Sequence, residues 1–182
     1  MLQRRLFIGI PLSSALASRL SKEMAAWPKE IFLKTDKDNL HVTLFFLGFV
    51  RENTVPDICE KVRALCETME SFEIEFSGIR LMPTPEDAKM VWLAGEPSEE
   101  LRDLKTAIER ELSFVVSAEP KIYRPHITLS RMKKARFQAL DPKPTIEKDI
   151  RLVESVDTVV VYESIMEDGK RRYMPIESVQ LI

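Results

Sequence analysis

The sequence is poor in the residues that mark several common classes of protein. It has two cysteines in 182 residues and no CxxC spacing, which excludes a disulfide-rich scaffold and disfavours a zinc ribbon. Cys59 and Cys66 both fall in a helical pattern, where they would lie about 10 Å apart along the axis, too far for a disulfide. We therefore expect two reduced thiols and a cytoplasmic protein.

Long apolar runs and an excess of positive charge are also missing. No apolar run approaches the roughly 18 residues that a membrane-spanning helix needs. The formal net charge of -2 argues against a protein that binds long nucleic acid through its phosphates, although a local patch suffices to bind one phosphate end. We expect a monomer that does not associate with a membrane.

The order of the expected secondary structure repeats along the chain. Each half shows a short apolar strand, a helix after a capping serine, and a strand that begins near a histidine. At an offset of 85 residues, Phe7 matches Trp92 and His41 matches His126. We predict an α+β chain in which residues 1–182 form one domain of two pseudo-symmetric lobes. The proline- and lysine-rich segment that follows the second histidine strand is expected to be a loop.

The two histidines stand in nearly identical motifs. The two copies are His41-Val42-Thr43-Leu44 and His126-Ile127-Thr128-Leu129. A chain with 9 threonines and 19 leucines would seldom place both residues at these positions after each of its only two histidines. Because a strand sends residues i and i+2 to one face, each motif presents an imidazole beside a hydroxyl and turns its apolar residues to the other face.

This pattern suits acid-base chemistry at phosphorus better than the alternatives. A zinc site needs three or four ligands, which two histidines on separate strands do not supply. A Ser-His-Asp triad is disfavoured because no G-x-S-x-G is present. In-line displacement at phosphorus needs one group that takes a proton and another that gives one, and histidine suits both tasks. Two threonine hydroxyls can donate to the phosphate oxygens, so no metal or other cofactor is required.

The longer signatures around both motifs resemble the 2H phosphoesterases, in particular the RNA 2',3'-cyclic phosphodiesterase branch, also called 2'-5' RNA ligase. They are residues 4–12, 39–48 and 124–131. The resemblance implies a bilobal fold with two antiparallel sheets flanked by helices and a central active-site cleft. It implies hydrolysis of RNA or nucleotide 2',3'-cyclic phosphate ends to 2'-phosphomonoesters. On this mapping His41 donates a proton to the leaving O3', His126 accepts one from water, and Thr43 and Thr128 bind the phosphate.

Two arginines are further candidates for the phosphate. The resemblance places Arg131 near the substrate, but strict alternation from His126 puts it on the opposite face. Either the strand ends or bulges after Leu129, or the side chain arrives by another route, or Arg131 is a solvated arginine at the end of the strand. Arg124 shares the parity of His126. By the same alternation Phe45 shares the face of His41 and could stack on a base, although core packing is more common for phenylalanine.

Three other functions stay open at this stage. One is a different 2H activity, such as trimming of 2'-5' oligoadenylate or of U-rich RNA 3' ends. The same histidines could run the reverse reaction, joining a 2',3'-cyclic phosphate to a 5'-hydroxyl end as a 2'-5' linkage. A module that binds nucleotides or RNA ends without turnover is a different class, but binding alone does not need two titrating groups.

Overall fold

The structure, a computed structural model, describes residues 2–117 and 122–182. Its elements, in chain order, are β1 (Gln3–Pro11), α1 (Ser14–Ala25), β2 (Phe32–Lys34), η1 (Lys37–Asn39), β3 (His41–Arg51), η2 (Glu52–Thr54), α2 (Val55–Cys66), β4 (Phe72–Met82), β5 (Met90–Gly95), α3 (Glu99–Glu111), β6 (His126–Met132), α4 (Lys134–Gln138), β7 (Lys148–Val156), β8 (Thr158–Glu167) and β9 (Lys170–Gln180). The expected α+β class is confirmed.

The strands described form one sheet with antiparallel pairing throughout. The order is β7-β4-β5-β6-β3-β1-β8-β9, and β2 pairs with β6 beside this path. The two halves meet where Val42 of β3 pairs with Ile127 of β6. The two sheets expected from the sequence are therefore the two halves of one continuous sheet, joined at a narrow junction.

The strand order is symmetrical about this junction. Outward from it, β6 corresponds to β3, β5 to β1, β4 to β8, and β7 to β9. The starts of β3 and β6 differ by 85 residues, as do the starts of α1 and α3. We propose on this basis that the chain is one domain of two similar lobes.

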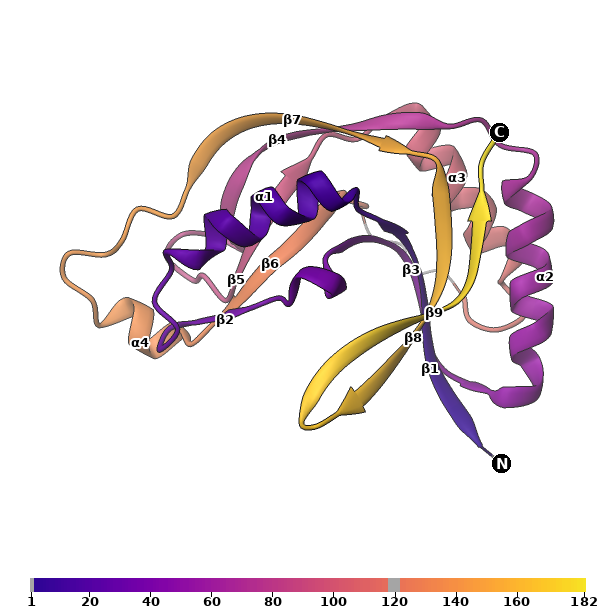
Figure 1. The fold of residues 1–182 in the computed structure, drawn as a ribbon, viewed down its shortest axis with the longest axis horizontal. Helices are drawn as coiled ribbons and strands as arrows, with labels where there is room; N and C mark the ends of the chain where they lie inside the picture. The colour runs from indigo at the N-terminus through magenta and orange to yellow at the C-terminus, as the bar shows by residue number, and fades with distance from the viewer. Residues whose placement is uncertain (1, 118–121) are drawn as a thin grey trace.

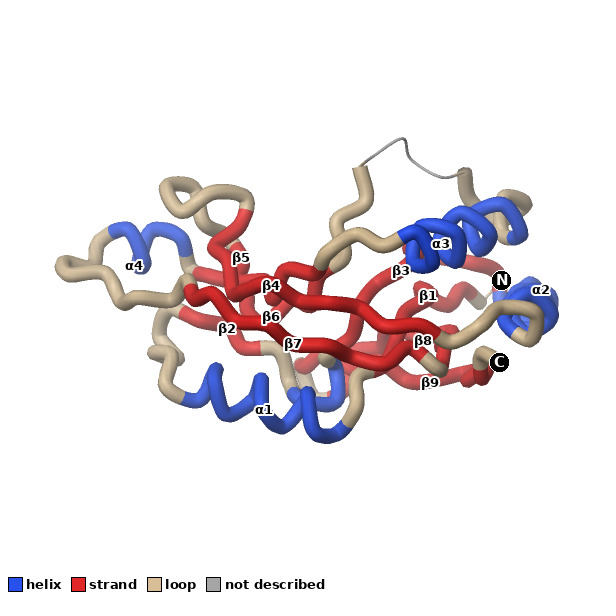
Figure 2. Tube along the Cα trace, turned by 90° about the horizontal axis from the view of Figure 1, so that it is seen from above, coloured by secondary structure: helices blue, strands red, loops and turns tan. Residues whose placement is uncertain are grey.

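The helices lie against the two halves of the sheet. Figures 1 and 2 show α1 along the half that contains β5, β6 and β7, and α2 and α3 at the other half. The Oγ atoms of Ser13 and Ser98 accept hydrogen bonds from the backbone of α1 and α3, each at 3.2 Å, as the sequence predicted for capping residues. In the described part of the chain, no helix is long and apolar enough to cross a membrane. Cys59 and Cys66 are both buried and free.

The expectation of a loop after the second histidine strand was wrong in part. Strand β7 and the short helix α4 occupy this region. The alternation of β7 is disguised because the core-facing position between Leu152 and Val156 holds a glutamate. Glu154 is only 8% exposed and accepts hydrogen bonds from the backbone N–H and the hydroxyl of Ser13. Its carboxylate therefore ties β7 to the start of α1, which satisfies a buried charge that the sequence pattern could not explain.

Candidate active site

The two histidine motifs lie side by side at the junction of the two halves. Because the strands run antiparallel and Val42 pairs with Ile127, His41 falls beside Thr128 and Thr43 falls beside His126. All four side chains share one face, since each lies one residue from this central pair, and we call this the site face. His41 and His126 are diagonal neighbours across the two strands, and the Cα atoms of such neighbours usually lie about 7–8 Å apart.

The two imidazoles are oriented in the same way. Nδ1 of His41 lies 2.7 Å from the carbonyl oxygen of Asn39, and Nδ1 of His126 lies 2.8 Å from that of Arg124. A carbonyl oxygen only accepts, so each Nδ1 carries a proton and donates it. Nε2 is then the nitrogen available for proton transfer on both rings. In His41 it lies 2.9 Å from Oγ1 of Thr43.

Burial and mutual repulsion favour the neutral form of both histidines. Burial is the main cause that lowers the pKa of His41, opposed by its hydrogen bond to Asn39, and charge on His126 lowers it further. Burial also lowers the pKa of His126, opposed by the bond to Arg124. Because a charge on one ring disfavours a charge on the other, the doubly charged pair is disfavoured, and the two imidazoles hold at most one extra proton between them more readily than two.

Each histidine packs on an aromatic ring that the sequence analysis did not assign to the site. The ring of Trp92 is stacked on His126, with centroids 3.6 Å apart and planes 14° apart. The ring centroids of Phe7 and His41 lie 4.8 Å apart, with 38° between the ring planes. Tyr173 meets His41 edge-on, with 5.0 Å between the ring centroids. The signal was present in the sequence, because Phe7 and Trp92 correspond at the repeat offset of 85 residues.

A bulge in β3 changes which phenylalanine shares the face of His41. Ile8 pairs with Phe45 and the next residue of β1, Gly9, pairs with Thr43, so Leu44 is the extra residue. Leu44 and Phe45 are both buried in the core. Phe46 is 65% exposed, and its ring centroid lies 6.0 Å from that of Phe7. The face that alternation gave for Phe45 was therefore wrong, whereas the alternative of core packing is confirmed, and Phe46 takes the position on the site face.

The equivalent bulge in β6 brings Arg131 to the face of His126. Trp92 pairs with Thr128 while Val91 pairs with Ser130, which leaves Leu129 as the extra residue. Arg131 is exposed and pairs with Met90. Met90 lies two residues from Trp92 and so faces the same side, which puts Arg131 on the site face. Of the possibilities considered from the sequence for the course of this strand, the bulge is the one found.

Arg124 contributes to the site through its backbone. It is exposed and precedes β6, and its carbonyl oxygen accepts the hydrogen bond from His126. The matching residue before His41 is Asn39, which lies 85 residues earlier. The side chain of Asn39 also accepts from the backbone N–H of Tyr173 at 3.1 Å and donates to the carbonyl of Arg171 at 2.7 Å. It thereby holds the β8–β9 hairpin against the His41 strand.

Among the residues that the structure describes, no group of three or more histidine, cysteine, aspartate or glutamate side chains is placed to hold a metal ion. The groups that surround the two histidines are aromatic rings and hydroxyls. The hydroxyls are suited to hydrogen bonding, and the imidazoles themselves to proton transfer.

Comparisons with known proteins identify the family and the fold. The sequence pattern of the 2'-5' RNA ligase superfamily matches residues 16–163. An RNA 2',3'-cyclic phosphodiesterase of Methanothermobacter thermautotrophicus is 30% identical over 135 residues, covering 72% of this chain and 73% of that protein. One of Aeropyrum pernix is 37% identical over 107 residues, covering 57% of this chain and 60% of that protein. A crystal structure of a Thermus thermophilus protein has the same fold, with a TM-score of 0.82, 22% identity and 97% of each chain covered.

Proposed function

Because this chain belongs to the 2'-5' RNA ligase superfamily, whose sequence pattern matches residues 16–163, we propose that it hydrolyses 2',3'-cyclic phosphate ends of RNA to 2'-phosphomonoesters. The observation that carries the proposal is the diagonal pair of histidines, each with Nδ1 bound to a backbone carbonyl and each beside a threonine of the other strand. The names of the relatives support the substrate class.

The reaction follows from these positions. His126, in its neutral form, takes a proton from water as the oxygen attacks phosphorus, and His41, in its charged form, gives its Nε2 proton to the leaving O3'. The P–O3' bond breaks as the new P–O bond forms, and the 2'-phosphate remains. Thr43 and Thr128 donate hydrogen bonds to the non-bridging oxygens, and Arg131 adds positive charge on the same face. The assignment of acid and base rests on the family resemblance.

The aromatic rings assist in different ways. Trp92 lies flat against His126, so its π face favours the positive charge that His126 gains when it takes the proton. Phe46, exposed and close to Phe7, offers the base of the terminal nucleotide a surface for stacking. We further propose a cytoplasmic monomer, which the two buried free thiols suit.

The test uses adenosine 2',3'-cyclic phosphate in the presence of EDTA. We expect the 2'-phosphate as product, and losses of about 10²- to 10⁴-fold in kcat for His41→Ala and for His126→Ala. Thermal unfolding of both variants serves as the folding control. Equal turnover in the wild type and in either folded variant would show that these histidines do not perform the reaction.

The reverse reaction is a second candidate, which the superfamily's description favours. An RNA 5'-hydroxyl would then replace water as the nucleophile on the same face. An RNA with a 5'-hydroxyl, added to the same assay, distinguishes the two directions by the formation of a 2'-5'-linked product.

A further inference from the structure

The site face continues along β3 as a stripe of exposed aromatic and basic side chains. Phe46 and Phe49 are 65% and 69% exposed, and the exposed Arg51 ends the strand. On β1, the exposed Arg5 lies directly opposite Phe49. We propose that Phe49, Arg5 and Arg51 bind the second nucleotide of an RNA strand, next to the one that carries the cyclic phosphate. This inference rests on the proposed function and defines its substrate as an oligonucleotide end.

The pairing of β1 with β3 establishes that these side chains share the site face. In β1, Leu6 and Ile8 belong to the main core, whereas Phe7 packs with Tyr162 and Tyr173 on the other face. Alternation puts Arg5 on the side of Phe7. Directly opposed residues of antiparallel strands point to the same side, so Phe49 lies on this face as well.

The two bulges of β3 set the spacing of the stripe. The second one leaves Leu47 as the extra residue, because Leu6 pairs with Gly48 and Phe7 pairs with Phe46. Gly48 has φ 71°, a conformation that glycine adopts freely, and the chain then places Phe49 outward. Thr43, Phe46 and Phe49 therefore follow one another at three-residue intervals, each of about 10 Å at most. Successive nucleotides of an extended strand can reach successive members of this series.

The chemistry of the stripe fits single-stranded RNA. Exposed aromatic rings on a sheet stack on bases without regard to their identity, and arginines bind the phosphates between them. Strands β1 and β3 contain no acidic residue. Within residues 2–117 and 122–182, no ion pair involves Arg5 or Arg51, so both guanidinium groups can bind phosphate.

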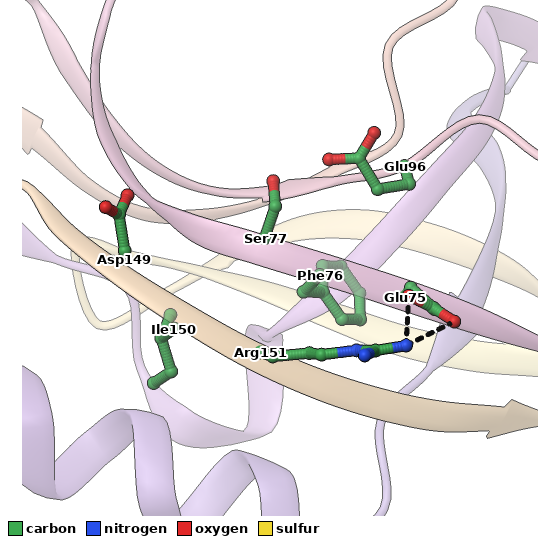
Figure 3. Close-up of a pocket in the computed structure, with 7 residues that line it drawn as sticks. All are labelled: Glu75, Phe76, Ser77, Glu96, Asp149, Ile150 and Arg151. Atoms are coloured by element: carbon green, nitrogen blue, oxygen red, sulfur yellow. Dashed lines mark hydrogen bonds and ion pairs between the residues drawn. The ribbon is translucent and has the colours of Figure 1, made fainter.

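The other half of the sheet does not offer an equivalent path. A hollow of about 380 Å³ lies along β4 and β7 and is lined by Glu75, Glu96, Asp149 and Arg151, with Phe76, Ser77 and Ile150 (Figure 3). The one arginine is held by Glu75, with both carboxylate oxygens 3.2 Å away. Alternation in β4 puts Glu75 on the side away from the buried Ile74 and Phe76, which is the site face. Carboxylates there repel a phosphate chain, and Arg80, which lies opposite Trp92 on this face, is already paired with Asp149. The charges therefore favour a path of the RNA over β3 and β1.

The experiment compares two substrates in the full-length protein. One is adenosine 2',3'-cyclic phosphate, and the other is a triadenylate that ends in a 2',3'-cyclic phosphate. We expect Phe49→Ala to lower kcat/KM for the triadenylate by about 5- to 150-fold, the usual loss for one stacked base, and to leave the mononucleotide rate unchanged. Phe114→Ala is the matched control, because Phe114 is also exposed, at 51%, but lies at a groove beside α2.

Salt dependence tests the two arginines. The double variant Arg5→Gln, Arg51→Gln should reduce the slope of log K against log salt by about 1.4 for the triadenylate, or about 0.7 for each phosphate that is no longer neutralised. The affinity for a fluorescent triadenylate with a 2'-phosphate end is measured in parallel by anisotropy. If the wild type hydrolyses neither substrate, the proposed function fails, and the loss of affinity in Phe49→Ala still decides whether this face binds RNA.

Two results would overturn the inference. The first is equal rates and affinities for the triadenylate in the wild type and in Phe49→Ala. The second is a wild type that sediments as a dimer and a Phe49→Ala variant that sediments as a monomer with unchanged RNA affinity, which would make the stripe a contact between copies of the chain.

Discussion

Trp92 should raise the pKa of His126 through its π face, and this can be measured directly. The ring centroids lie 3.6 Å apart, well within the roughly 6 Å limit for a cation–π interaction. Such a contact is worth about 0.5–2 kcal/mol in favour of the charged imidazole. Leucine keeps an apolar neighbour but removes the π face. Trp92→Leu should therefore lower the pKa of His126, adding to the lowering that burial already causes.

The composition of the chain makes the assay unambiguous. Only two histidines are present, so an NMR titration follows two imidazole signals, which His41→Asn assigns. Phe7→Leu is the matched control and should shift the signal of His41 more than that of His126, because Phe7 contacts His41 at 4.8 Å. If His126 is the base, it must be neutral to act, so the acid limb of the kcat/KM profile should move to lower pH in Trp92→Leu.

The structure also predicts that this substitution is tolerated. Nε1 of Trp92 is buried and has no hydrogen-bond partner among the described residues, so the leucine removes no hydrogen bond. An unchanged or raised pKa of His126 in a folded Trp92→Leu variant would refute the cation–π argument. An equal shift of both histidines would also refute it, since it would indicate a general change of the site.

Two further predictions concern Arg131 and Glu154. Arg131→Gln should lower kcat/KM for a cyclic phosphate by at least 10-fold, because it removes a charged hydrogen-bond donor. Arg124→Gln should have a smaller effect, because the backbone carbonyl of Arg124 is what contacts His126. A larger loss of kcat/KM in Arg124→Gln than in Arg131→Gln would contradict the placement of Arg131 by the bulge. Glu154→Ala should destabilise the fold by about 2–3 kcal/mol, since it removes charged hydrogen bonds to Ser13, and should lower Tm by about 4–12 °C in calorimetry. A Tm within about 2 °C of the wild type would contradict that role.

Much of the fold could be predicted because local pattern and packing agree. The capped helices, the paired histidine strands and the internal repeat follow from periodicity and from serines at the expected positions. Strand β7 could not be found in this way, because a buried carboxylate takes a core position and only its distant partner, Ser13, explains it. Long-range compensation of this kind leaves no signal in the neighbouring sequence.

The site was predicted less completely, for a geometric reason. The four histidine and threonine side chains precede the bulges, so strict alternation describes them correctly. Beyond Leu44 and Leu129 each strand gains one residue on the core side, and alternation then gives the wrong face. At residues 44–45 and again at 129–130, two apolar or small residues stand next to each other. Such a pair fits a bulge, but it fits a strand that is buried on both faces equally well, so the sequence alone does not distinguish the two.

The bulges also make the two halves of the site chemically different. Phe46 and Arg131 occupy equivalent positions, 85 residues apart, and each is the first residue on the site face after its bulge. One is suited to a base and the other to a phosphate or another negative group. The histidines are related by the repeat and have the same backbone anchors, so they alone give a cyclic phosphate no reason to bind in one orientation. If the proposed function holds, flanks of different chemistry supply that reason, because stacking on the Phe46 side would fix the nucleoside and leave the phosphate toward Arg131. On that proposal, the residues one bulge beyond each histidine would set which of the two acts as acid and which as base.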